Sequence, residues 1–223
     1  MHSLLRAGLG LGLVLGAAAA SAADLRGHVT LTSVNGETSP VDLEDTVVFF
    51  SPDSPVRPRA LGDQTMTMQG KSFSPHVLTV TEGTTVHFTN ADPILHNVFS
   101  TSYPNDFDMG LYGHGGGKAK TFVSPGLVRV YCNVHHEMFA YILVLNTPYF
   151  TALRNDGSFD LRNLPNAPGT LTIYNPRSQP WKRHVTGGPQ APFELQLTMV
   201  QSGVPAHFNK LGKPYSNNPG SGY

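Results

Sequence analysis

The feature that most constrains this chain is a seven-residue stretch, Cys132-Asn133-Val134-His135-His136-Glu137-Met138, which contains the only cysteine in 223 residues. A histidine lies three positions after the cysteine, and a methionine lies three positions after that histidine. Three potential metal ligands at this spacing can come from one tight loop between two β-strands. A fourth ligand must then come from elsewhere in the fold, and His96 is the best-placed candidate.

The four side chains form a donor set that suits copper. A thiolate is soft and binds Cu(I) well, and imidazole suits both oxidation states of copper. A thioether is weak and polarizable, so it can lie at long range without imposing a geometry. The sequence therefore predicts one copper per chain in a trigonal site of the kind that transfers electrons. His96, Cys132 and His135 are the predicted strong ligands, and Met138 is the predicted weak axial ligand.

Other interpretations of these residues remain open at this point. Zinc is the main rival metal, but it prefers thiolate, imidazole and carboxylate to thioether. A lone cysteine is usually a small buried hydrophobe, and a catalytic Cys/His pair is also possible. A rotated loop could offer His136 or Glu137 in place of His135 or Met138. His114 is a candidate for a second metal site, although no partner ligands cluster near it in the sequence.

These motifs resemble a known family. The Cys-x2-His-x2-Met loop resembles the copper loop of amicyanin, a blue copper protein of the cupredoxin superfamily. The run His96-Asn97-Val98 resembles the segment that carries the first histidine in amicyanin and plastocyanin. The resemblance covers about residues 63 to 146. It implies that the Asn97 amide donates to the Cys132 sulfur and that the Asn97 side chain ties the two ligand loops together.

A longer resemblance is to the periplasmic proteins described as methylamine-utilisation-like. It rests on His-Asn-Val-Phe-Ser at 96–100, the segment Gly110-Leu111-Tyr112, Cys-Asn-Val-His at 132–135, and Asn146-Thr147-Pro148-Tyr149-Phe150. That description names a family and does not establish a methylamine substrate.

The spacing of glycine and proline predicts an all-β chain. The 23 glycines and 18 prolines separate short alternating apolar runs, as in folds built from strands and turns. Residues 121–123 and 127–131 flank Pro125-Gly126 and are expected to form a hairpin, and the second of these strands leads into Cys132. Residues 112–118 are rich in glycine and are expected to form a flexible excursion.

The flanks of this region predict a second β-structure. Asn155-Asp156-Gly157-Ser158-Phe159-Asp160-Leu161, followed by Leu164-Pro165, resembles the signature of carboxypeptidase-regulatory-like domains, which are small transthyretin-like sandwiches. We expect residues 24–60 and 147–200 to form such a sandwich. Residues 61–146 are expected to form a cupredoxin Greek-key barrel inserted between them, and residues 201–223 a flexible tail. The alternative is a cupredoxin with a separate C-terminal appendage.

Residues 1–23 have the pattern of a secretory signal peptide. A positively charged start precedes an apolar run from Leu9 to Ala20 and small residues at Ser21-Ala22-Ala23. The apolar run is too short to span a membrane well. We therefore expect a protein that is periplasmic or otherwise exported, with no membrane span in the mature chain. In an oxidising compartment a single cysteine cannot form an internal disulfide, and a metal is one way to use it.

The charge balance narrows the choice of partners. With 15 Lys and Arg against 15 Asp and Glu, the formal net charge is zero, which gives no electrostatic argument for nucleic acid or an anionic membrane. The predicted function is a blue copper protein that carries single electrons between redox partners, and no enzyme activity or catalytic residue is predicted. The expected partner surface surrounds His135 and includes Pro93, Ile94, Leu95 and Phe139.

The alternative function is a periplasmic copper carrier, chaperone or metal-binding accessory protein. The pair Met66 and Met68 could support such a role, although two methionines on one face of a strand are more often part of a core. A copper enzyme would need additional copper ligands, and His114 is the only loose candidate.

Overall fold

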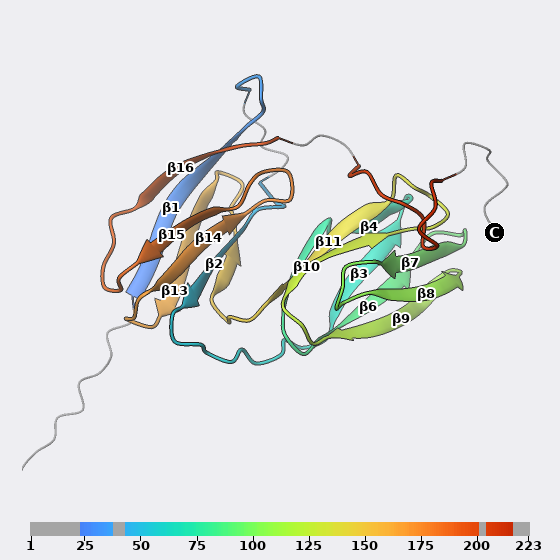
Figure 1. Ribbon diagram of the computed structural model, residues 1–223, viewed down its shortest axis with the longest axis horizontal. Helices are drawn as coiled ribbons and strands as arrows, with labels where there is room; N and C mark the ends of the chain where they lie inside the picture. The colour runs from blue at the N-terminus through green and yellow to red at the C-terminus, as the bar shows by residue number, and fades with distance from the viewer. Residues whose placement is uncertain (1–22, 38–42, 201–203, 216–223) are drawn as a thin grey trace, which may run out of the picture.

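The computed structural model describes residues 23–37, 43–200 and 204–215. Within these ranges the chain is all-β, as the sequence predicts, with sixteen strands and no helix. No helix in the described part of the chain is long and apolar enough to cross a membrane. The strands form four sheets that pack in pairs, and Figure 1 shows the two pairs side by side.

The first pair of sheets is the flanking sandwich, which combines strands from both ends of the chain. In one sheet β1 (Ala23–Thr32) lies between an antiparallel and a parallel neighbour, and in the other β2 (Val47–Pro52) lies between two antiparallel neighbours. The sheet orders are β13 (Ser158–Leu164), β1 (Ala23–Thr32), β16 (Phe193–Thr198), and β12 (Phe150–Ala152), β2 (Val47–Pro52), β14 (Gly169–Tyr174), β15 (Trp181–Val185). Leucines, valines and phenylalanines from both flanks share one buried core.

The second pair of sheets is the inserted sandwich, which lies between β2 and β12 in the sequence. Its sheet orders are β5 (Val77–Thr81), β11 (Phe139–Leu145), β10 (Gly126–Tyr131), β7 (His96–Ser100), β8 (Phe107–Tyr112), and β4 (Ser72–Ser74), β3 (Gln64–Gln69), β6 (Thr84–Asn90), β9 (Gly115–Phe122). Strand β6 alternates buried and half-buried side chains, as expected for a strand with one face on a core. Val86 and Phe88 are fully buried on that face.

The inserted sandwich leaves and rejoins the flanking sandwich at neighbouring strands. The chain departs after β2 and returns at β12, and these two strands pair antiparallel through Phe49 and Phe150. A third apolar cluster contains residues of both sandwiches: Val47, Leu143, Leu145 and Tyr174 are buried in it. The two sandwiches therefore contact each other through apolar side chains as well as through the connecting chain.

The hairpin expected over residues 121–131 is wrong. Strand β9 pairs with β6, whereas β10 pairs with β11 and β7 in the other sheet. The chain crosses from one sheet to the other at Pro125-Gly126, so Phe122 and Val128 enter the same core from different sheets. The expected flexible excursion is also wrong in part, because β9 already begins at Gly115.

Two terminal predictions fall partly outside the described residues. Residues 1–22 of the predicted signal peptide lie outside them, and Ala23 is the first residue of β1, opposite Leu164. Residues 201–203 and 216–223 of the expected tail also lie outside. Residues 204–215 of that tail, however, contact the inserted sandwich through hydrogen bonds and ring packing.

Candidate metal centre

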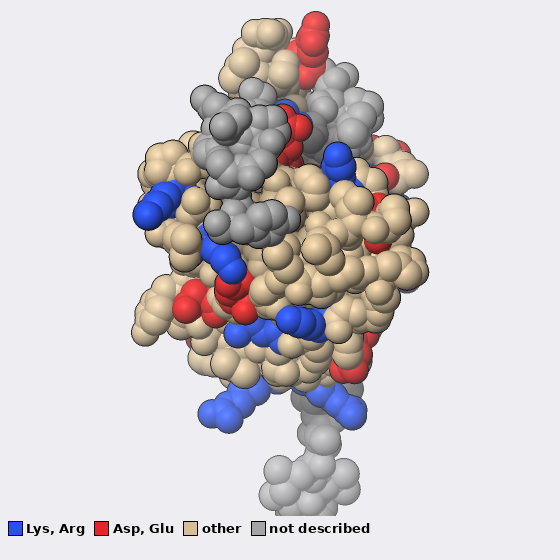
Figure 2. Space-filling view, turned by 90° about the vertical axis from the view of Figure 1, so that its right-hand side faces the viewer, with Lys and Arg blue, Asp and Glu red and all other residues tan. Residues whose placement is uncertain are grey.

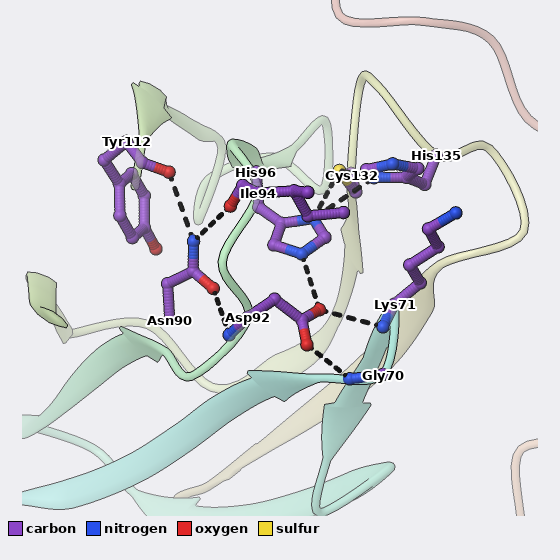
Figure 3. A network of polar contacts seen from close by, with 9 residues as sticks. All are labelled: Gly70, Lys71, Asn90, Asp92, Ile94, His96, Tyr112, Cys132 and His135. Atoms are coloured by element: carbon purple, nitrogen blue, oxygen red, sulfur yellow. Dashed lines mark hydrogen bonds and ion pairs between the residues drawn. The ribbon is translucent and has the colours of Figure 1, made fainter. Parts of the chain in front are cut away.

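Three side chains from two separate parts of the sequence meet at one end of the inserted sandwich. His96 is the first residue of β7, Cys132 follows β10 directly, and His135 lies in the loop between β10 and β11. Their donor atoms all lie within 4.8 Å of one another. The Cys132 Sγ is 3.8 Å from His96 Nδ1 and 3.7 Å from His135 Nδ1, and the two Nδ1 atoms are 3.1 Å apart. Figure 3 shows both imidazole rings beside the sulfur.

These separations fit a single small metal ion. For Zn²⁺, bonds of about 2.0 Å to imidazole nitrogen and about 2.3 Å to thiolate separate two donors by about 3.3 to 3.7 Å at angles near 110–120°. The observed separations of 3.1 to 3.8 Å are close to that range. His96 and Cys132 are fully buried, so two of the three donors are shielded from water.

The loop that follows Cys132 is closed by its own backbone. The Cys132 amide donates to the Met138 carbonyl at 3.0 Å, and the Met138 amide donates to the His135 carbonyl at 2.9 Å. The last cross-strand pair of β10 and β11, Tyr131 with Phe139, flanks this loop. Met138 is 1% exposed and belongs to the same apolar cluster as Cys132. The tight loop between two strands predicted from the ligand spacing is therefore present.

A buried carboxylate fixes the orientation of His96. Since a carboxylate can only accept, His96 donates from Nε2 to Asp92 Oδ2 at 2.8 Å, which leaves the Nδ1 lone pair facing Cys132. The backbone amides of Gly70 and Lys71 also donate to Asp92, at 2.7 and 2.9 Å. Hydrogen bonds from Lys71, Gly70 and then His96 hold the pKa of Asp92 at about 2. Asp92 is therefore ionised at neutral pH and accepts the hydrogen bond from His96 as a carboxylate.

His135 is prepared to act as a neutral ligand. It is half-buried. Burial lowers its pKa, electrostatic interactions with His96 and Lys71 lower the pKa further, and Asp92 opposes this in part. A lowered pKa favours the neutral imidazole, which is the form that binds a metal.

The remaining candidate residues lie outside this group. His136 and Glu137 are exposed, and the His136 ring lies 5.6 Å from the ring of Tyr215. His114 is exposed as well. Among the described residues, His96, Cys132 and His135 are the only His, Cys, Asp or Glu side chains grouped closely enough to hold a metal ion together.

Two supporting residues differ from expectation. The Asn97 side chain was expected to tie the two ligand loops together, but it donates to Asp108 Oδ1 at 2.7 Å. Asp92 was missed in the sequence as a support for His96. Its position four residues before the histidine was the only local signal, and the decisive partners, Gly70 and Lys71, lie about 21 positions earlier in the chain.

Comparison with known proteins gives matches among solved structures alone. No protein-family model matches the chain, and no curated protein matches it. A copper-containing nitrite reductase from Thermus scotoductus is 31% identical over 42% of this chain, with a TM-score of 0.37. A purple cupredoxin from Nitrosopumilus maritimus is 24% identical over 37% of this chain, with a TM-score of 0.33. A reduced, singly substituted form of amicyanin is 19% identical over 44% of this chain, with a TM-score of 0.36.

The matched structures thus include amicyanin and another cupredoxin, which belong to the superfamily that the motifs resemble. The aligned part spans 26% of the nitrite reductase, 100% of the purple cupredoxin and 98% of amicyanin. These three TM-scores are below 0.5, so the function proposed below rests on the side chains of the site itself.

Proposed function

We propose that this chain is an exported type 1 copper protein that carries single electrons between redox partners. The observation that carries the proposal is the buried Cys132 thiol, which has the Nδ1 atoms of His96 and His135 at 3.8 and 3.7 Å. Met138 ends the same loop and would supply a thioether, which zinc does not favour and copper tolerates as a weak ligand. Copper supplies reversible one-electron exchange between Cu(II) and Cu(I).

The protein's contribution is to hold the ligands still. Asp92, which is itself held by two backbone amides, fixes His96. The backbone hydrogen bonds between Cys132, His135 and Met138 fix the loop. A site with the same geometry in both oxidation states needs little rearrangement during electron transfer. Burial of His96 and Cys132 also keeps water away from the ligand positions.

The exposed apolar residues near His96 give a surface for a redox partner. Ile94 and Leu95 are 39% and 51% exposed in the segment that leads into His96, and Pro93 beside them is exposed. Figure 2 shows a broad area of uncharged side chains on the end of the molecule that is on the right in Figure 1. Transient redox encounters use small interfaces, so a patch of this kind is sufficient. Phe139, which was also expected at this surface, packs its ring against His76 and Tyr141.

The copper-carrier alternative receives less support. Met66 and Met68 are both fully buried in the core of the inserted sandwich, where they cannot pass a metal to a partner. A carrier also needs ligands that open easily, whereas two of the three donors here are fully buried. Met138→Gln separates the two roles: in an electron carrier it keeps copper and lowers the reduction potential, because a thioether favours Cu(I).

The main test uses metal analysis and visible spectroscopy of the oxidised protein. We expect one copper per chain and an intense thiolate-to-copper charge-transfer band. Cys132→Ser should abolish the band, and His135→Gly should alter it. His136→Gly is a matched control, because this neighbouring histidine is exposed and outside the donor group. A colourless Cu(II)-loaded protein, or a band that survives Cys132→Ser, would contradict the proposal.

A further inference from the structure

Residues 204–215, the C-terminal strap, run from the flanking sandwich to the candidate metal centre. Figure 1 shows this segment as the dark red trace beside the loop between β10 and β11. The chain just before it is fixed to the flanking sandwich: the Met199 amide donates to the Thr32 carbonyl at 2.8 Å, and the Val200 amide donates to the Arg177 carbonyl at 2.8 Å. The strap therefore connects the flanking sandwich with the loop between β10 and β11, called the ligand loop below.

The end of the strap contacts the backbone of a candidate ligand. The Tyr215 hydroxyl donates to the Cys132 carbonyl at 3.4 Å, and its ring lies 5.6 Å from the His136 ring. A phenol hydroxyl carries its proton at neutral pH, so the Tyr215 hydroxyl can act as the donor.

The middle of the strap contacts the loop that follows Cys132 directly, and it reaches the segment of His96 through Asp108. The Lys210 amide donates to Asn133 Oδ1 at 3.0 Å, directly after Cys132. The Lys210 Nζ pairs with Asp108 Oδ2 at 2.8 Å, and Asp108 Oδ1 accepts from the Asn97 side chain at 2.7 Å. Asn97 follows His96, so one lysine is linked to the surroundings of two predicted ligands.

The start of the strap covers the residue before the cysteine. The His207 ring stacks on the Tyr131 ring, with centroids 4.0 Å apart and an angle of 11° between the planes. The same His207 ring also meets Tyr215 edge-on at 5.2 Å. Residues 131, 132 and 133 thus each receive a contact from a different part of the strap.

The strap has a folded turn of its own. The Gly212 amide donates to the Asn209 carbonyl at 2.9 Å, and the Leu211 and Lys213 amides donate to Asn209 Oδ1 at 2.9 and 3.1 Å. Gly212 has a φ of +72°, a conformation that glycine adopts readily. This turn presents Lys210 to the ligand loop in a defined position.

From these contacts we propose that the C-terminal strap is a positioning element that holds residues 131–133 in place and so keeps the metal ligands assembled. The contacts of the strap described above are not with the donor atoms, so the strap acts through the backbone of residues 131–133. The part of the proposal that concerns copper retention rests on the proposed function. The part that concerns the order of the ligand loop applies to the metal-free protein as well.

The first experiment compares two shortened chains. One ends at Val200 and lacks the strap, and the matched control ends at Tyr215 and keeps it. Amide hydrogen exchange of residues 132–138 is measured without metal, and copper loss to a chelator is measured with copper bound. Each hydrogen bond contributes modestly, but removing the strap removes several contacts at once. Hydrogen exchange and copper loss should therefore both become about tenfold faster or more. The control should match the full chain. Equal exchange in the two shortened chains would overturn the proposal.

Point variants keep the test valid if the chain ending at Val200 does not fold. Tyr215→Phe and Lys210→Met each remove one contact and should speed hydrogen exchange in residues 132–138 about threefold. Lys213→Met is the matched control, because that side chain has no described contact with the loop. The thermal midpoint of the chain should move no more than in the control. Exchange unchanged in both point variants would reject the strap as a positioning element.

The two proposals fail in distinguishable ways. If the full chain takes up no copper, the proposed function fails, and the metal-free exchange experiment still decides on the strap. If the full chain binds copper with the expected band but its retention and loop exchange do not depend on residues 204–215, the strap proposal fails alone.

Discussion

At the scale of single residues, Asp92 supports the candidate site without being a predicted ligand. It receives hydrogen bonds from His96, Gly70 and Lys71, and its carboxylate is held as an anion. A carboxylate behind a ligating imidazole fixes the tautomer and raises the basicity of the metal-binding nitrogen. The residue therefore controls how His96 presents Nδ1 to the metal.

We predict that Asp92→Asn weakens copper binding about 10- to 100-fold, because partners of this kind have effects of that size. The measurement is a competitive titration against a chelator of known affinity. Asp63→Asn is the matched control, since Asp63 forms a similar pair with His87 at 3.0 Å but on an exposed surface, outside the group of donor side chains. Equal affinity in both variants would show that the bond to His96 does not matter for the metal.

The predicted ligands illustrate what short-range pattern can and cannot provide. Cys132, His135 and Met138 lie within seven residues, so their spacing alone indicates a common loop. His96 was recognised by motif resemblance, and the structure does bring it to the same point. The role of Asp92 depends on the turn at Gly70-Lys71, which approaches only after β3 and β6 pair in the fold. Sequence spacing contains no information about that approach.

At the scale of elements, strand β9 contains a glycine that the sheet requires. Gly117 has a φ of +68°, and a Cβ atom there would lie 1.6 Å from the Phe88 carbonyl oxygen on the neighbouring strand β6. The register of the β6–β9 pair is irregular between Phe88 and Asn90, next to this contact. Residue 117 is thus a position where the backbones approach too closely for any side chain.

We predict that Gly117→Ala destabilises the folded chain, because backbone strain alone costs about 1–3 kcal/mol. Displacement of β6 by the added methyl group should increase this loss. Gly116→Ala is the matched control, because nothing lies within 4 Å of its Cβ position. Chemical denaturation of both variants gives the comparison. A stability loss that is the same at 116 and 117 would show that the close approach is absent in solution.

Elements also show where pattern reasoning failed. The apolar residues on either side of Pro125-Gly126 correctly predict two strands, but alternation alone cannot say whether neighbouring strands share a sheet. Here Phe122 and Val128 face one core from two different sheets. The C-terminal strap was missed for a related reason: its contacts are a few specific hydrogen bonds and ring stacks, and its glycine, proline and asparagine content resembles that of a loose tail.

At the scale of the whole molecule, the two sandwiches share an apolar contact. Val47 and Tyr174 from the flanking sandwich and Leu143 and Leu145 from the inserted sandwich are buried together. We propose that residues 24–60 with 147–200 and residues 61–146 are two domains that unfold as one unit because of this contact. Buried apolar area of this kind resists separation, since its exposure to water is unfavourable.

We predict that Leu145→Ala uncouples the two sandwiches, because removing a buried leucine side chain costs about 2–5 kcal/mol. The fluorescence of Trp181, the only tryptophan, reports on the flanking sandwich, and the copper band reports on the inserted one. In the unmodified chain the two denaturation curves should coincide, and in Leu145→Ala they should separate. Val123→Ala, at a residue that is 63% exposed, is the control. Separate curves already in the unmodified chain would contradict the coupling.

The pairing of the first strand with the last has a consequence for the order of folding. Strand β1 lies parallel to β16, and Thr32 and Leu197 are 165 positions apart. Closing so long a loop is entropically costly, and contacts of this separation form slowly. A folded inserted sandwich shortens that loop, because its chain enters and leaves at the neighbouring strands β2 and β12. We therefore expect the inserted sandwich to fold first and the flanking sandwich to close only after β16 has been synthesised. Until then, the edge of β1 that pairs with β16 is exposed.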